Sequence, residues 1–119
     1  MEELTKTEEK IMQVLWALKS AFVKDIIEQM PDEPKPPYNT ISSVVRLLET
    51  KGYIGHKAYG KTHEYFPLIS KAAYRKHSLT KLVANYFDGS AKSLLSFMVK
   101  EETLSDKDIE EIQKMIDKH

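Results

Sequence analysis

Hydrophobic residues recur at helical spacing near the start of the chain. One stripe consists of Ile11, Val14, Leu15 and Leu18. This pattern predicts an amphipathic helix, because residues three and four positions apart share one helical face. Thr5 and Glu8 have the spacing of a capping box, in which each side chain accepts a hydrogen bond from the other's backbone N–H. The first helix is therefore expected to begin after Thr5, with Trp16 as a packing residue.

The same spacing continues over residues 23–30 and again from Asn39. We expect a short second helix at 23–30 that Pro31 ends, since four of the five prolines lie in residues 31–37 and form a stiff connector. The third helix has an apolar, core-facing stripe that consists of Ile41, Val44, Val45 and Leu48. Gly52 is placed to end this helix in a left-handed conformation.

Residues 54–66 predict a two-stranded hairpin. Ile54–Tyr59 and Thr62–Phe66 are strand-like, and Gly60–Lys61 suits a two-residue type II′ turn because glycine accepts positive φ at its first position. In this register Lys57 lies opposite Glu64, and His56 lies opposite Tyr65. Three short helices followed by a hairpin are the layout of a winged helix-turn-helix. We call the hairpin the wing.

The last third of the chain predicts three short amphipathic helices, with Ser70, Ser90 and Ser105 as their capping residues. Their apolar faces carry Leu79, Leu82, Val83, Tyr86, Phe87, Leu94, Leu95, Met98, Ile109, Ile112 and Ile116. So few residues make a thin core, which a second copy of the chain would cover. We therefore expect a dimerisation region; the alternative is a monomer in which these helices fold back on the preceding domain.

The predicted fold class is mostly α (α+β), with a winged helix-turn-helix DNA-binding domain at residues 1–69 and a helical dimerisation domain at residues 70–119. Charge follows this division although the net charge is zero. Residues 1–33 hold 4 Lys/Arg and 8 Asp/Glu, residues 38–77 hold 7 and 2, and residues 101–119 hold 3 and 7. A basic middle between acidic ends suits a protein that presents one face to a polyanion, although chance clustering is the simpler alternative.

Composition excludes several classes of protein. The chain has no cysteine, so it has neither a disulfide framework nor a thiolate metal site. Its hydrophobic runs fall short of the roughly 18 residues that span a bilayer, and its acidic N-terminus is unlike a signal peptide. We expect a cytoplasmic protein with no membrane partner.

The outer face of the third helix is the main candidate for DNA contact. Asn39, Thr40, Ser42 and Ser43 are short and polar, which lets a helix approach base edges closely in the major groove. Arg46 is long enough to reach guanine or phosphate. On the wing, Lys57, Lys61 and Tyr65 are expected to meet phosphates or the minor groove. The alternatives are plain solvation of the helix face and a cross-strand pair between Lys57 and Glu64.

Two other functions were weighed. An enzyme is not expected, because the chain carries no glycine-rich phosphate loop, no zinc-binding His–Glu motif and no local nucleophile signature. His56 and His63 could approach each other on the wing and bind a metal, but two histidines without carboxylate support more often pack or solvate. We predict no catalytic residue, metal or cofactor. A winged helix that binds protein instead of DNA would carry an apolar patch on its third helix.

The chain resembles the BlaI/MecI family of penicillinase-repressor transcriptional regulators. The resemblance lies in the segment Glu8–Trp16, in Thr40-Ile41 through Lys51-Gly52-Tyr53-Ile54, in Tyr65-Phe66-Pro67-Leu68-Ile69-Ser70, in Phe87-Asp88-Gly89-Ser90 and in Leu104-Ser105 with Ile109-Glu110-Glu111-Ile112. It implies a homodimer that represses transcription from a palindromic operator, of a resistance or sensor-protease operon. The family's DNA contacts carry over onto Asn39, Thr40, Ser43 and Arg46, and onto the wing around Lys61 and Tyr65.

Three points of the family pattern bear on this chain. The family often has arginine followed by leucine late in the recognition helix, where this chain has Leu47-Leu48 with Arg46 one step earlier. Family repressors of resistance genes are released when a membrane sensor-protease triggers cutting in the dimerisation domain, and the matching register is Phe97-Met98, in a different local sequence. Copper-responsive relatives carry cysteines in their C-terminal part, and this chain has none.

Overall fold

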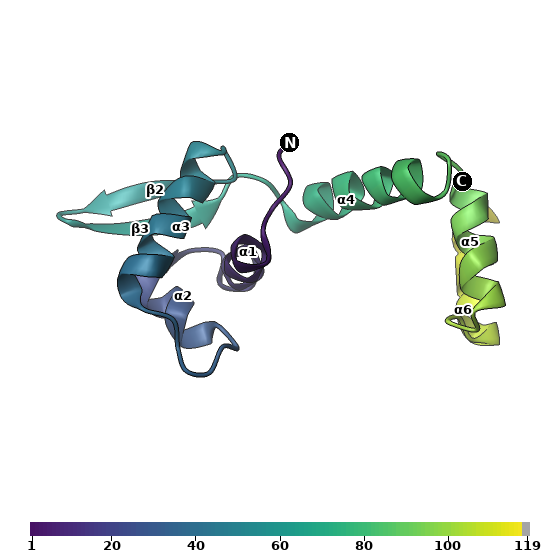
Figure 1. Cartoon of the computed structure of the whole chain (residues 1–119), viewed down its shortest axis with the longest axis horizontal. Coiled ribbons are helices and arrows are strands. Elements are labelled where there is room, and N and C mark those ends of the chain that lie inside the picture. The colour runs from purple at the N-terminus through teal and green to yellow at the C-terminus, as the bar shows by residue number, and fades with distance from the viewer. Residues whose placement is uncertain (118–119) are drawn as a thin grey trace. The chain divides into compact units, whose positions relative to one another are not determined.

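The computed structural model describes residues 1–117, without the side chains of residues 113 and 115–117. Its elements are α1 (Lys6–Leu18), β1 (Ala21–Phe22), α2 (Val23–Gln29), α3 (Tyr38–Thr50), β2 (Ile54–Tyr59), β3 (Thr62–Pro67), α4 (Lys71–Tyr86), α5 (Ala91–Lys100) and α6 (Asp106–Asp117) (Figure 1). They divide into two compact units, residues 1–75 and the residues from 76 on. We call these the N-terminal unit and the tail.

The predicted helix starts are confirmed by their hydrogen bonds. Thr5 Oγ1 accepts the N–H of Glu8 at 3.2 Å, and the Glu8 carboxylate accepts the N–H of Thr5 at 2.8 Å. Ser70, Ser90 and Ser105 each accept the N–H of the residue three positions later. Three bounds differ by one residue, since α2 ends at Gln29 rather than residue 30, α3 begins at Tyr38 rather than Asn39, and β3 ends at Pro67 rather than Phe66.

The sheet has three strands in the order β1-β3-β2, all antiparallel. The wing register is confirmed, with Lys57 opposite Glu64 and His56 opposite Tyr65. Gly60 has φ +64 and Gly52 has φ +84, so each adopts the left-handed conformation that its turn or helix end requires. β1 was not predicted, because a strand of two residues carries no periodic pattern.

The N-terminal unit has a continuous hydrophobic core. Its buried hydrophobic residues are Ile11, Met12, Val14, Leu15, Ala21, Val23, Ile26, Met30, Ile41, Val45, Leu48, Tyr53, Ile54 and Tyr65. Trp16 packs against this core and donates its indole N–H to the carbonyl of Ile69 at 2.9 Å, as expected of a packing residue. Two residues of the predicted stripes lie further out, since Leu18 is 41% exposed and Val44 is only partly buried.

One charged pair is enclosed with the core. The Glu8 carboxylate is 1% exposed and receives the ammonium of Lys51 at 2.9 Å. The carboxylate therefore bonds both to the Thr5 backbone and to the end of α3. This contact links the start of α1 to Lys51, the residue that follows α3.

The boundary between the two units lies inside α4, after Arg75. Tyr74 explains why the first turn of α4 belongs with the N-terminal unit. Its ring lies 5.7 Å from that of Trp16 and 6.0 Å from that of Tyr53, measured between ring centroids. The sequence predicted the domain boundary between Ile69 and Ser70, just before α4 begins.

The tail leaves its hydrophobic side chains open within a single chain. α4 and α5 lie wholly in the described part, and neither contains a buried residue. Leu79, Leu82, Tyr86, Phe97, Val99 and Ile109 are 38–78% exposed. Val83, Phe87, Leu94, Leu95, Met98 and Ile112 are partly exposed, and the side chain of Ile116 lies outside the described residues. No helix of the described residues has the length and hydropathy needed to span a bilayer.

Candidate nucleic-acid interface

The predicted recognition face of α3 is open to solvent. Asn39, Thr40, Ser43 and Arg46 are exposed, and Ser42 is partly exposed. The opposite face of the helix supplies Ile41, Val45 and Leu48 to the core. The Arg46 Nε–H donates to the carbonyl of Ser42 at 3.4 Å, a contact within the helix that leaves the guanidinium on the surface. We keep the name recognition face for these five residues.

Two larger side chains next to this face were missed by the sequence reasoning. Tyr38 is 55% exposed and Leu47 is 49% exposed, although Leu48 beside it is fully buried. Leu47 lies one helical turn after Ser43, so it extends the recognition face with an apolar group. Such a group can contact the methyl of thymine in the major groove. The sequence alone does not show which of two neighbouring leucines is exposed. That depends on how the helix is oriented against the core.

A polar hollow of about 260 Å³ lies between α2, α3 and the wing. Its lining residues are Phe22, Val23, Lys24, Tyr38, Ser42, Arg46, Lys61, Thr62, His63 and Tyr65. Three cations and one histidine from four separate elements or turns thus meet around one space. Within the described residues, no acidic side chain lines it. An arrangement of this kind favours an anion.

Lys24 and His63 were not predicted as DNA contacts, and it is the fold that brings them to the hollow. Lys24 lies in the first turn of α2. His63 lies on β3, next to the predicted contacts Lys61 and Tyr65 in the sequence. Nothing in the local pattern around Lys24 marks it, because its approach to the wing depends on how α2 packs.

Tyr65, which the sequence predicts as a DNA contact, packs its ring into the core and reaches the surface only where it lines the hollow. Tyr65 is 4% exposed, and its phenol lies within reach of the charges of Glu49 and Arg46 on α3. Burial raises the pKa of its phenol above the ordinary value; Glu49 adds to this rise and Arg46 opposes it. The sequence places Tyr65 on a ribbon but does not show which side of the ribbon packs inward. Tyr65 forms the floor beneath the hollow and offers no exposed ring to a phosphate.

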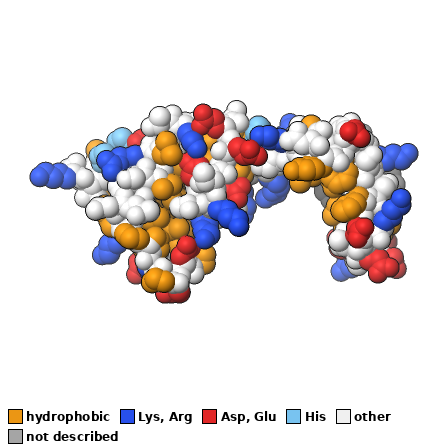
Figure 2. Space-filling view, viewed as in Figure 1, with side chains coloured by type: hydrophobic (Ala, Val, Ile, Leu, Met, Phe, Trp, Pro, Cys, Tyr) orange, Lys and Arg blue, Asp and Glu red, His pale blue; other side chains and the backbone are white. Residues whose placement is uncertain are grey.

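The two lysines of the wing have different surroundings. Lys61 lies at the exposed turn, beside the hollow. Lys57 lies on the side of the hairpin away from the hollow, where it pairs across the strands with Glu64. Its ammonium lies 5.4 Å from the centre of the Tyr59 ring. Figure 2 shows Lys and Arg side chains reaching the outer end of the hairpin, with histidine beside them. Both lysines remain candidates for backbone contact.

The two wing histidines do approach each other, as the sequence suggested. The rings of His56 and His63 stack at 4.1 Å between centroids with 6° between their planes. Nδ1 of His56 also contacts the Glu49 carboxylate of α3. Even so, among the described residues no group of three or more His, Cys, Asp or Glu side chains is arranged to hold a metal ion.

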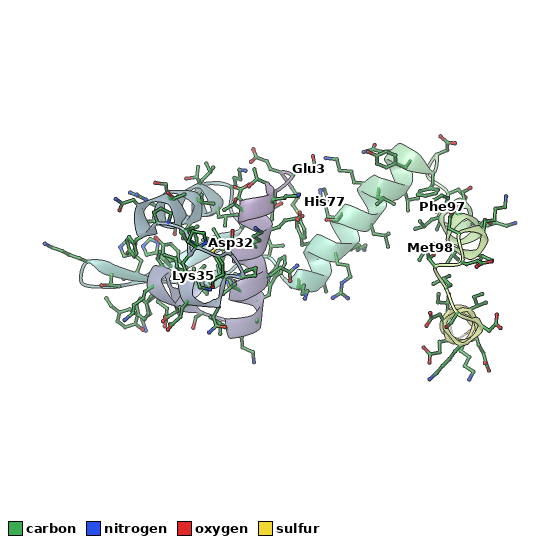
Figure 3. All side chains as sticks on the ribbon, turned by 60° about the horizontal axis from the view of Figure 1, so that its bottom comes forward. Glu3, Asp32, Lys35, His77, Phe97 and Met98 are labelled. Atoms are coloured by element: carbon green, nitrogen blue, oxygen red, sulfur yellow. The ribbon has the colours of Figure 1, made fainter. Side chains whose placement is uncertain are left out.

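The segment with the register of a cleavage site is helical. Phe97 and Met98 both lie on α5 (Figure 3). The Phe97 ring is 50% exposed and packs against Phe87 at 5.7 Å between centroids. The carbonyl of Met98 accepts hydrogen bonds from both the N–H and the hydroxyl of Thr103. A protease would therefore need this end of α5 to open locally before the backbone could enter its active site.

Comparison with known proteins identifies the family of this chain. The family model described as Penicillinase repressor matches residues 4–118. The methicillin resistance regulatory protein MecI of Staphylococcus aureus strain N315 is 26% identical over 116 residues, which cover 98% of this chain and 94% of MecI. The penicillinase repressor of Bacillus licheniformis is 20% identical over 117 residues, with 98% and 91% covered.

A solved structure supports the fold of the N-terminal unit. The solution structure of the DNA-binding domain of the repressor BlaI aligns with a TM-score of 0.52 at 23% identity, over 62% of this chain and 94% of that domain. This likeness confirms the predicted winged-helix fold. Since the family model spans nearly every residue, the chain belongs to the penicillinase repressor family, the BlaI/MecI family of transcriptional repressors.

Proposed function

We propose that this repressor acts in the cytoplasm as a homodimer on a palindromic operator in double-stranded DNA. In each copy, the recognition face of α3 enters the major groove. The wing and the hollow beside it hold the phosphate backbone. The observation that carries the proposal is the exposed polar face of α3 next to a hollow lined by Lys24, Arg46 and Lys61.

The division of roles follows from the side chains. Asn39, Ser43 and Arg46 can exchange hydrogen bonds with base edges, which differ between base pairs in the major groove. Lys24 and Lys61 can neutralise phosphates, which gives affinity and register without sequence choice. For a two-fold dimer the two half-sites should lie about one helical turn apart, roughly 10 base pairs.

The dimer part of the proposal rests on the tail. Leu79, Leu82 and Tyr86 of α4 are 42–78% exposed in the single chain, at spacings that place them along one side of the helix. Figure 2 shows hydrophobic side chains gathered on the visible face of the tail. A second tail is the occupant that closes such a surface with two-fold symmetry.

The family resemblance extends the proposal to induction. Repression of a resistance or sensor-protease operon would end when a protease cuts near Phe97 and Met98. A gene for a membrane metalloprotease next to this one would support that route. Cutting of the purified chain at another position, with loss of operator binding, would exclude Phe97-Met98 as the site.

The proposal is tested by selection and titration. The full-length chain is used to enrich duplexes from a random-sequence pool, and the affinity for an enriched duplex is then measured at several salt concentrations. An enriched palindrome and a steep loss of affinity with salt are expected, with a slope of about −0.9 for each phosphate neutralised. Failure to bind any duplex at low salt would end the proposal.

The alternative is a winged-helix module that binds protein through α3. Tyr38 and Leu47 give it some support, because both are about half exposed beside the recognition face. The cations around the hollow argue against it. The same selection separates the two functions, since a protein-binding module would enrich no duplex sequence.

A further inference from the structure

The two histidines of the wing form a built arrangement rather than a chance contact. His56 pairs with Tyr65 and His63 with Ala58, so the two histidines are diagonal neighbours on the side of the hairpin that faces α3. Their parallel rings stack at 4.1 Å. Both rest against the ring of buried Tyr65, at 5.9 Å for His56 and 6.1 Å for His63.

Among the described residues, a carboxylate contacts one ring of the stack and not the other. Nδ1 of His56 contacts Glu49 Oε2, whereas His63 lines the hollow with Lys24, Arg46 and Lys61. The side chains of His56 and Glu49 are about one-third exposed, at 33% and 31%, so protons exchange with water. The stack therefore has an anion at one end and a space suited to an anion at the other.

We propose that His63 binds a backbone phosphate of DNA in this hollow and takes up a proton as it does so, with His56 and Glu49 as its positioning residues. This rests on the DNA-binding function proposed above and adds a residue and a proton to it. The affinity for the operator would then depend on pH through the wing.

The charges around the stack explain why His63 takes up a proton only when a phosphate is bound. Two imidazolium rings at 4.1 Å would repel each other, so the stack opposes a charge on both rings at once, and the Glu49 carboxylate faces His56 rather than His63. Lys24, Arg46 and Lys61 around the hollow further oppose a second positive charge.

The remaining titratable groups near the hollow do not supply a counter-charge. Burial raises the pKa of the Tyr65 phenol, so that group brings no negative charge near pH 7. Glu49 is already engaged by His56, and Asp25, beside Lys24, accepts the N–H of Phe22 and is not among the residues that line the hollow. A DNA phosphate brings the missing anion, which favours the charged form of a group beside it.

The sign of the effect follows from linkage. Because the bound state holds one more proton than the free state, the gain in affinity is fully present at low pH and is lost as pH rises through the titration of His63 in the complex. One linked proton changes affinity by at most about tenfold per pH unit. We expect the wild-type chain to bind about tenfold more tightly at pH 6 than at pH 8.

The test uses the full-length chain and a fluorescent duplex enriched from a random pool by the same protein at pH 7. Affinity is measured by anisotropy from pH 5.5 to pH 8.5 at constant ionic strength. His63→Gln should lose the pH dependence, with affinities at pH 6 and pH 8 that agree within about twofold. His56→Gln should keep the pH dependence and move it to higher pH, because the stacked cation is gone.

Lys61→Gln is the matched control. It lies beside the same hollow and carries a charge that does not titrate in this range. It should weaken binding at every pH and keep a pH dependence of the same steepness, moved to higher pH because one opposing cation is gone. A purely structural role for His63 would instead make His63→Gln weaker at every pH in the same manner.

Wild-type pH dependence in His63→Gln would overturn the proposal. If that variant does not fold, the ring of His63 is followed by NMR in the wild-type chain, without and with the duplex. The midpoint of its titration should move to higher pH when DNA is added, and an unmoved midpoint would also overturn the proposal. Loss of all DNA binding in wild type and every variant alike would instead mark a failure of the DNA-binding function.

Discussion

The two units of this repressor bury their hydrophobic side chains to very different degrees. The N-terminal unit encloses fourteen hydrophobic residues from three helices, the sheet and the chain between them, with Ile11, Leu15 and Leu48 fully buried. The tail, across α4 and α5, encloses none within the single chain. Burial of apolar surface is the main force that stabilises a fold. The N-terminal unit therefore has what it needs to fold alone, whereas α4 and α5 leave their apolar side chains uncovered, and the proposed second copy would cover them.

This difference suits a repressor with two tasks. A self-sufficient core can hold α3 and the wing in a fixed geometry whether or not DNA is present. An open apolar tail can make DNA affinity depend on the pairing of two copies. Loss of pairing would then weaken repression without unfolding the unit that reads DNA.

The largest expected effect comes from a charge in the tail. Leu82→Glu should make the chain monomeric at micromolar concentration and weaken operator binding by about 100-fold or more, because the second half-site no longer gains from the first. Sedimentation gives the mass and anisotropy the affinity. Asn85→Glu, an exposed polar position on α4, is the control and should remain dimeric. A dimeric Leu82→Glu would refute the assignment of the tail.

Truncations in the two units sharpen the comparison further. Leu48→Ala should lower the free energy of unfolding of the N-terminal unit by about 2–5 kcal/mol, since Leu48 is fully buried. Leu79→Ala, made in the monomeric Leu82→Glu background, should change stability by only about 0.5 kcal/mol, because Leu79 is 52% exposed. Denaturant titration measures both. Equal costs would show that the tail has a core of its own in the monomer.

Substitutions at Arg46 and Lys61 should distinguish contacts with bases from contacts with phosphates. Arg46→Ala should cost about 1–3 kcal/mol on the enriched duplex and relax sequence preference if the guanidinium holds a base. Lys61→Ala should weaken binding to all duplexes alike and reduce the salt slope by about one. Affinities for the enriched duplex and for a scrambled one, at several salt concentrations, give both results. An equal loss on both duplexes would assign Arg46 to phosphate alone.

The smallest effect concerns acid stability. Burial alone would raise the pKa of Glu8, but the Thr5 backbone N–H and the Lys51 ammonium outweigh it and hold that pKa below its ordinary value of 4.5. The stability from the ionised carboxylate is therefore present above pH 4.5 and is lost as pH falls through the lowered pKa. Glu8→Gln should flatten this acid dependence in thermal melts of the N-terminal unit. Parallel curves for wild type and variant would contradict the assignment.

Much of the fold could be predicted because its signals are local. Thr5 with Glu8, Gly52, and Gly60 with Lys61 each specify a helix end or a turn within a few residues, and the wing register follows from its turn. Features that depend on packing between elements were not predictable in this way. These include the two-residue strand β1 and the inward side of the hairpin.

The residues of the candidate site likewise divide into those with a local signal in the sequence and those brought there by packing between elements. The recognition face follows from the helical period, so its exposed residues could be named from the sequence. Lys24 could not, because only the packing of α2 brings it to the hollow. The contact of Glu49 with His56 and the burial of Tyr65 likewise depend on how the wing lies against α3.

The central claim, that α3 lies in the major groove of DNA in two copies, can be tested by directed cleavage. Because the chain contains no cysteine, a cysteine at Ser43 can carry an iron–EDTA group as the single label. The account predicts two symmetric clusters of strand cleavage on the enriched duplex, about 10 base pairs apart. A label at Ser93 on α5 is the control. Cleavage from position 43 that is no stronger or more localised than from position 93 would contradict the account.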